Sequence, residues 1–153
     1  MEPHALAALI EQTVSEGGSF RLLATGNSMF PFLRSGRDFV ELVSPERRRP
    51  GRNEIVLFRR KKQPPASSYV LHRVLRALPD GTLVINGDSQ NWTEEIAPGQ
   101  VIAVAETILR GPRALSCGNP LYRFAVNLWR LTRPLRYPLS VLYLKFHTKE
   151  KNE

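Results

Sequence analysis

The sequence predicts a mainly β fold in a single domain of 153 residues. Twelve prolines and ten glycines are spread along the chain, a density typical of many short elements joined by turns rather than of a helical bundle. Apolar runs of strand length lie between these turn residues. A chain of this length can bury one substantial core and is too short for two ordinary domains.

Each element follows from a local pattern. Apolar residues at helical spacing predict a short amphipathic helix over residues 4–15, which Gly17 and Gly18 end. The apolar runs that follow predict six strands, over residues 20–25, 38–43, 54–60, 69–78, 82–86 and 100–109.

A hairpin is predicted where Pro79-Asp80-Gly81 separates two of these strands. If the loop has three residues, Leu78 faces Thr82 and paired positions sum to 160. His72 then lies opposite Asp88, with Cβ atoms about 5 Å apart. A loop longer or shorter by one residue would break this register.

Positive charge is concentrated in two segments of a chain whose net charge is +8. Residues 46–62 carry six Arg and two Lys against two Glu, and residues 112–153 carry five Arg and three Lys against two Glu. Such clusters attract phosphate in nucleic acid or in anionic lipid. A solvated loop surface is an equally good interpretation of residues 46–62.

The chain changes character at Pro120, where apolar and basic residues alternate at helical spacing. We expect a domain over residues 1–111, with its core in residues 20–110, followed by a basic amphipathic tail over residues 112–153. This tail fits a helix lying in the plane of an anionic membrane surface. The alternative is that it packs on its own domain or on a second copy of the chain.

The expected compartment is the cytoplasm, either free or peripherally on a membrane. Cys117 is the single cysteine, so no internal disulfide can form and nothing indicates an oxidising compartment. The N-terminus lacks the basic and apolar regions of a secretory signal. No uncharged run approaches the roughly 18 residues of a membrane span.

Ser28 and His72 form the candidate catalytic pair. Ser28 lies in a loop rich in Gly, Asn and Pro, and His72 interrupts an apolar strand. A serine hydroxyl becomes a good nucleophile when a base accepts its proton, and a neutral imidazole suits that role, so activity should rise between about pH 5.5 and 7.5. Asp88 and Glu94 are both candidates for the carboxylate that orients the imidazole, with Asp88 favoured by the hairpin register.

Four sequence boxes occur in a fixed order across residues 20–110. The chain resembles the superfamily of signal peptidase I and LexA-type repressor peptidases, in the branch that pairs serine with histidine. The residues that carry this resemblance are Gly26-x-Ser28-Met29-x-Pro31 with Gly36-x-Asp38, Glu54 to Phe58, Leu71-His72-Arg73-Val74, and Asn86-Gly87-Asp88.

The resemblance implies a coiled β-sheet peptidase domain with a short N-terminal helix and a helical C-terminal tail. Ser28 would be the nucleophile and its amide an oxyanion donor, with His72 as general base. Asp88 matches the acid of the last box, whereas Glu94 stands at the family's spacing of seven residues after the box glycine, where the family has aspartate. Met29 and Phe30 would line the substrate groove, and no metal or cofactor is expected.

The expected function is a serine endopeptidase that cleaves a leader or signal-like peptide from a precursor polypeptide. One alternative is a self-cleaving or regulatory relative of the repressor peptidases, for which Ala5 to Ala8 offers small residues. Another is a non-catalytic module that binds nucleic acid through the basic segments, although no stacking aromatic motif or reader helix is recognisable.

Overall fold

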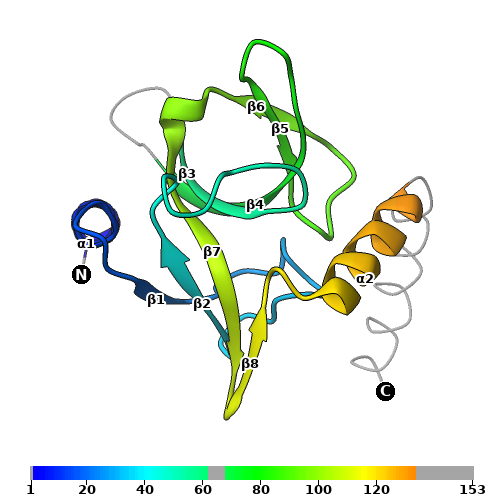
Figure 1. The fold of residues 1–153 in the computed structure, drawn as a ribbon, viewed down its shortest axis with the longest axis horizontal. Coiled ribbons are helices and arrows are strands. Elements are labelled where there is room, and N and C mark those ends of the chain that lie inside the picture. Colours follow the sequence, from blue (N-terminus) through cyan, green and yellow to red (C-terminus); the bar gives the residue numbers. More distant parts are fainter. Residues whose placement is uncertain (1, 62–67, 134–153) are drawn as a thin grey trace, which may run out of the picture.

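An antiparallel sheet of eight strands makes up most of the protein, in the computed structural model that describes residues 2–61 and 68–133 (Figure 1). The strands run in the order β1-β2-β7-β3-β4-β5-β6, and β8 pairs with the far end of β7. The prediction of a mainly β fold is therefore confirmed. The strands are β1 (Phe20–Leu23), β2 (Asp38–Val43), β3 (Ile55–Arg60), β4 (Ser68–Ala77), β5 (Leu83–Asn86), β6 (Glu94–Ile96), β7 (Val101–Arg110) and β8 (Arg113–Ser116).

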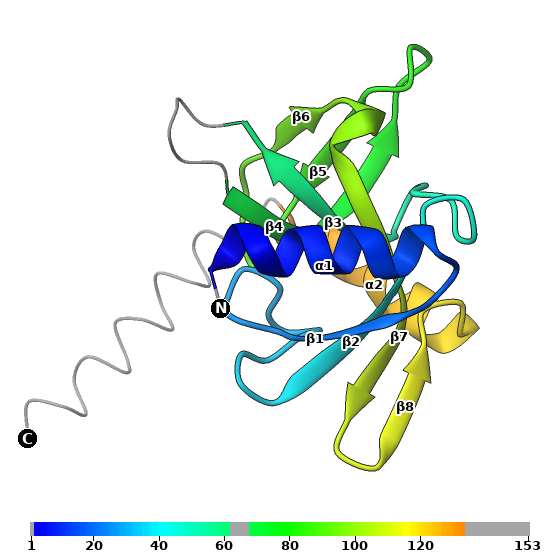
Figure 2. The same ribbon diagram turned by 90° about the vertical axis from the view of Figure 1, so that its left-hand side faces the viewer.

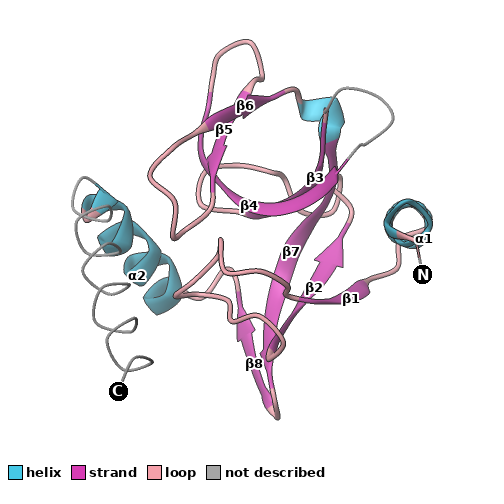
Figure 3. Cartoon of the chain, turned by 180° about the vertical axis from the view of Figure 1, so that it is seen from behind, coloured by secondary structure: helices cyan, strands magenta, loops and turns pink. Residues whose placement is uncertain are grey.

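The central strands are almost continuously apolar because each face of the sheet covers a core cluster. Neighbouring residues of β3 show this, since their side chains lie in different clusters. Leu57 packs in the first cluster, which includes Met29 and Ile108. Val56 packs in the second cluster, which includes Phe58 and Ile85. The first cluster lies between the sheet and both helices. The second lies within the curled half of the sheet, where β3, β4, β5 and β6 bend round beside β7 (Figure 3).

Helix α1 (Pro3–Ser15) crosses the sheet and contacts β1, β4 and β7 (Figure 2). Its inward face buries Ala7, Ile10 and Val14 in or against the first cluster. Gly17 follows with a φ of 86°, a backbone conformation that favours glycine and ends the helix. The helix predicted over residues 4–15 is thus confirmed.

The hairpin of β4 and β5 keeps the predicted register only near its turn. The Leu78 N–H donates to the Thr82 carbonyl at 2.8 Å, as predicted. A β-bulge between Val74 and Arg76 then shifts the pairing by one residue. A bulge places two residues opposite one, and beyond it Arg73 pairs with Asn86. The prediction that His72 lies opposite Asp88 is therefore wrong.

The C-terminal part of the described chain belongs to the same folded unit. Strand β8 pairs with β7, and helix α2 (Pro120–Leu131) buries Tyr122 and Val126 in the first cluster. The Asn119 side chain accepts hydrogen bonds from two amides of the first turn of α2 and caps it. The boundary predicted at residue 111 therefore does not separate a tail from the domain within residues 112–133. The remainder of the predicted tail, residues 134–153, lies outside the described residues.

Candidate active site

Ser28 lies in the loop between β1 and β2, where short backbone hydrogen bonds fix its position. Gly26 has a φ of 74°, which lets the chain turn sharply before the serine. Met29, directly after it, is buried in the first cluster, and its carbonyl accepts a hydrogen bond from the Leu33 amide at 2.9 Å. Ser28 itself is half-buried. An anchored neighbour on one side and a glycine turn on the other hold the serine in place.

Asp38, the acid of the first sequence box, ties the far end of this loop to the sheet. Its carboxylate is fully buried and accepts hydrogen bonds from Arg37, Arg110 and the Arg34 amide. Burial opposes ionisation, but these hydrogen bonds outweigh it and hold the pKa of Asp38 well below its usual value. This acid is therefore a structural anchor of the loop.

The turn after β5 also holds the loop that carries Ser28, through hydrogen bonds from Ser89. The Ser89 amide donates to the Ser28 carbonyl at 2.9 Å, and the Ser89 hydroxyl reaches the Asn27 carbonyl at 2.9 Å. A Cβ on Gly87 would lie 2.6 Å from the Ser28 carbonyl oxygen, so glycine is needed at that position. Ser89 was not predicted from the sequence, where only its place beside Gly87-Asp88 could have indicated a role.

A cavity of about 520 Å³ opens beside Ser28. It is largely apolar and lies between β1 on one side and the first half of β4 on the other, with α1 as a third wall. Of the two residues expected to line the substrate groove, Met29 lines this cavity, whereas Phe30 does not and is 42% exposed beside Arg34. The residues that line it include Leu6, Ala7 and Ile10 of α1, Leu22 of β1, and Tyr69 and Leu71 of β4.

His72 lies on β4, opposite Val56 of β3, and only 2% of it is exposed. Its ring packs near those of Phe58 and Trp92, with centroid separations of 5.9 and 6.3 Å. Burial chiefly lowers the pKa of His72, to about 4, with Arg60 adding to the effect and Glu94 and Asp88 opposing it. The ring is therefore neutral at physiological pH, as a general base must be. The rise in activity expected between about pH 5.5 and 7.5 assumed the pKa of an ordinary imidazole, and the pKa of His72 lies below that range.

Glu94, the first residue of β6, approaches the inner nitrogen of this ring. Its Oε1 lies 3.6 Å from His72 Nδ1, slightly beyond hydrogen-bonding distance. That Nδ1 is buried and has no hydrogen-bond partner among the described residues. The Glu94 carboxylate is also paired with Arg60, whose Nε donates to Oε2 at 3.0 Å. Glu94 therefore stands between a fixed guanidinium and a histidine whose nitrogen is unpaired.

Asp88 pairs with Arg73. The guanidinium donates from Nε and Nη2 to the two carboxylate oxygens, both at 2.8 Å, and both side chains are almost fully buried. Arg73 also donates to the Tyr122 hydroxyl and to the Asn53 carbonyl. Burial opposes the charge on Arg73, but the Asp88 carboxylate dominates and raises its pKa. One guanidinium binds both Asp88 oxygens, and Glu94 is the carboxylate paired with the His72 ring at 3.6 Å, so the structure favours Glu94 over Asp88 as its partner.

Ser28 and His72 are brought to the same region of the molecule. Ser28 lines the cavity together with Leu71, the residue before His72, and its carbonyl is held by the turn that follows β5. Within the described residues, the serine hydroxyl and the imidazole are not joined by a hydrogen bond, and the Ser28 amide donates none. Catalytic hydrogen bonds often tighten only when substrate binds. Since the Ser28 amide donates no hydrogen bond within the described residues, it is available as a donor to a ligand.

Three other findings bear on function. Burial raises the pKa of the Cys117 thiol to about 11, so at neutral pH this cysteine is protonated and a poor nucleophile. Neither helix of the described chain is long and apolar enough to cross a lipid bilayer. Comparison with known proteins identified no matching family model, no similar curated protein and no similar solved structure.

Proposed function

We propose that this protein is a serine endopeptidase that cleaves a peptide bond of a precursor polypeptide. In this proposal Ser28 is the nucleophile, His72 the general base and Glu94 the carboxylate that supports the histidine. The observation that carries it is the position of Ser28, which opens onto an apolar cavity between two strand edges. Leu71, which lines the same cavity, directly precedes the buried, neutral His72. A nucleophile, a base and a peptide-sized groove are the minimum such an enzyme requires.

The groove suits a substrate in extended conformation. Strand β1 pairs with β2 alone, and residues 68–72 of β4 pair with β3 alone, so among the described strands each has one unpaired edge. A peptide strand can add to such an edge through backbone hydrogen bonds, while side-chain pockets supply selectivity. The cavity walls are mainly aliphatic, so the pocket favours an aliphatic substrate side chain.

The chemistry follows from these groups. The Ser28 Oγ attacks the substrate carbonyl carbon while its proton passes to His72. The oxyanion that forms accepts a hydrogen bond from the Ser28 amide, and Glu94 stabilises the imidazolium through Nδ1. His72 then protonates the leaving amine, which departs with the C-terminal product. Water, deprotonated by His72, hydrolyses the Ser28 ester and restores the hydroxyl.

The resemblance to the signal peptidase I and LexA-type superfamily supports this proposal from an independent direction. The sequence boxes around Ser28, His72 and Gly87 come from three separate segments, and all three lie around the one cavity or the turn beside it. Glu94 stands at the spacing of the acid in the serine-histidine branch. The precursor segment cleaved would then be a leader or signal-like peptide.

The two other functions considered from the sequence have less support. Ala5 to Ala8 lie within α1, and Ala7 is buried, so self-cleavage there would require part of α1 to unfold. Nucleic-acid binding would use the basic segment of residues 46–62, but several of its arginines pair with glutamates. These pairs are Arg47 with Glu106, Arg48 with Glu54 and Arg60 with Glu94.

A peptide library tests the proposal directly. The wild-type protein is incubated with extended peptides that carry aliphatic residues, and products are identified by mass spectrometry. Ser28→Ala and His72→Ala should each remove most of the turnover, because nucleophile and base act as a unit. Ser35→Ala, which changes an exposed serine of the same loop, should leave it unchanged. A Ser28→Ala protein that cleaves at the wild-type rate would contradict the proposal.

A further inference from the structure

Helix α2 carries a stripe of large apolar side chains that the rest of the described chain does not cover. Its members are 54 to 79% exposed, more than any large apolar residue elsewhere in the described chain. Scattered exposed leucines are ordinary on a protein surface, whereas a contiguous apolar patch marks a site of interaction. The stripe consists of Leu121, Phe124, Leu128 and Leu131.

The stripe lies opposite the face by which α2 packs on the domain. Its members are spaced by three, four and three residues, which places them within roughly one quarter of the helix circumference at 3.6 residues per turn. Tyr122, Val126 and Trp129 occupy the opposite side, where the first two are buried and the Trp129 indole donates to the Asp88 carbonyl at 2.7 Å. The helix thus has two apolar faces, and only one of them packs against the part of the chain that the structure describes.

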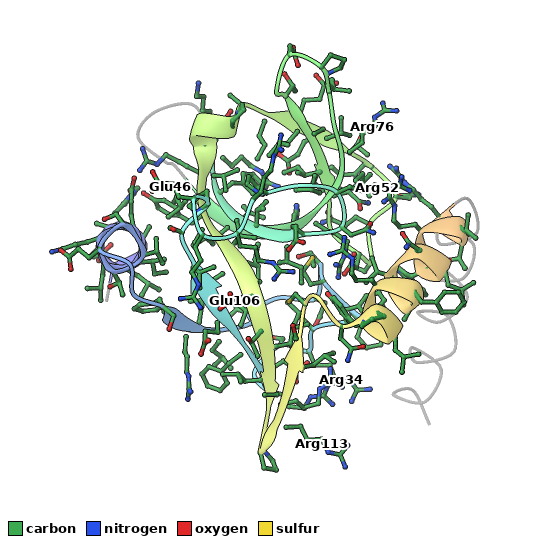
Figure 4. The ribbon with its side chains drawn as sticks, in the orientation of Figure 1. Arg34, Glu46, Arg52, Arg76, Glu106 and Arg113 are labelled. Carbon is green, nitrogen blue, oxygen red and sulfur yellow. The ribbon has the colours of Figure 1, made fainter. Side chains whose placement is uncertain are left out.

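Basic residues predominate in the segment that contains the stripe. Residues 112–133 contain four arginines and no acidic residue, and Arg123 among them pairs with Glu54 at 3.3 Å. Arg52, an exposed residue, lines a hollow beside Leu131 at the C-terminal end of α2. Figure 4 shows Arg52 and Arg76 on the same side of the molecule as α2. An apolar stripe in basic surroundings combines the two attractions that hold a helix at an anionic lipid surface.

We propose that the α2 stripe docks this protein on an anionic membrane surface, independently of its enzymatic activity. A second copy of the chain is a poorer partner, because two molecules of net charge +8 repel each other. A convex helix face also needs no complementary groove to enter a fluid bilayer, where the four side chains would insert at the headgroup boundary. Because Trp129 contacts the Asp88 turn, docking would hold the Ser28 region about one helix diameter, roughly 10 Å, from the lipid.

Vesicle flotation with the full chain tests this surface. The probes are vesicles of neutral phosphatidylcholine and vesicles in which a third of the lipid is anionic phosphatidylglycerol. We expect wild-type protein to float with the anionic vesicles at low salt and to be partly released as the salt concentration rises. The double variant Phe124→Gln with Leu128→Gln should bind the anionic vesicles at least about tenfold more weakly, because two exposed side chains no longer insert.

The matched control is Leu9→Gln with Leu115→Gln, which removes two exposed leucines on α1 and β8 and should bind like wild type. Equal binding by wild type and the α2 double variant would overturn the proposal, as would equal loss in the control. Sedimentation without lipid adds a further check. A concentration-dependent dimer that the α2 double variant abolishes would identify the stripe as a contact between copies and would also overturn the proposal.

Discussion

Two carboxylates close to the candidate active site lie in contrasting surroundings. Asp88 is buried against Arg73, and both of its oxygens accept hydrogen bonds at 2.8 Å. Glu94 is partly exposed, is paired with Arg60, and lies 3.6 Å from a histidine nitrogen that has no partner in the described chain. The first arrangement is complete, whereas the second needs a movement of less than one ångström to form a new hydrogen bond.

In the proposed mechanism the two carboxylates have different roles. The pair of Asp88 and Arg73 joins β4, the turn after β5 and Tyr122 of α2, and that turn holds the carbonyl of Ser28. Asp88 therefore helps to position the loop that carries Ser28 through backbone contacts. Glu94 instead faces the ring that would gain a proton during catalysis, and its charge would be most useful at that moment.

The largest effect is expected for Asp88→Asn. The substitution keeps the shape of the side chain but leaves the Arg73 charge buried without a counterion, and breaking a buried pair in this way costs about 3 to 5 kcal/mol. We expect the free energy of unfolding in urea to fall by that amount. Asp80→Asn, in an exposed turn, is the control and should leave the free energy of unfolding close to that of wild type. A fully stable Asp88→Asn protein would show that the buried pair is not structural.

A somewhat smaller effect is expected in the pH dependence of stability. The folded-state pKa of His72, about 4, is below the value near 6.5 of an exposed imidazole, so the unfolded chain binds the extra proton more readily. Its contribution to stability is complete above about pH 6.5 and is lost as the pH falls toward 4, a change of about 3 kcal/mol.

The measurement compares urea unfolding of wild type and His72→Asn from pH 7 to pH 4. The variant should lack this share of the acid destabilisation. Parallel curves for wild type and His72→Asn would mean that the ring is not held neutral by burial.

The smallest of the three effects is expected for Glu94→Gln. Loss of the carboxylate removes the support for the imidazolium, and we expect kcat/KM to fall about a hundredfold, or about 2.7 kcal/mol of transition-state stabilisation. Because the Glu94 charge raises the pKa of His72, the acid limb of the pH profile should move to lower pH. Glu95→Gln, at the next and exposed position of β6, is the control. Wild-type rates in Glu94→Gln would remove Glu94 from the mechanism.

The strands and the first helix could be predicted because local patterns determine them. Gly17 and Gly18 end α1, and Pro79-Asp80-Gly81 sets the hairpin turn. The β-bulge beyond Val74 could not be predicted, since it depends on how the curled sheet packs rather than on the turn. Because of this one-residue shift in pairing, His72 does not lie opposite Asp88. Asp88 instead forms an ion pair with Arg73.

The packing of residues 112–133 on the domain could not be predicted for a related reason. Helix α2 is apolar on two sides, and periodicity alone identifies an amphipathic helix without showing which side packs on the domain. Tyr122 and Trp129 proved to contact Arg73 and the Asp88 turn, contacts between residues more than 40 positions apart. Conversely, Ser28 and His72 could be proposed from residue type and context, because a polar nucleophile and a base in such positions are chemically conspicuous.

The central claim is that Ser28 is an activated nucleophile with His72 as its base, and covalent labelling measures this without a known substrate. The protein is incubated at neutral pH with a fluorophosphonate, which reacts with activated serines, and the adduct is located by peptide mass spectrometry. We expect a single adduct on Ser28, none in Ser28→Ala, and labelling at least about a hundredfold slower in His72→Ala than in wild type. An absence of label on Ser28, or equal labelling rates in wild type and His72→Ala, would contradict the account.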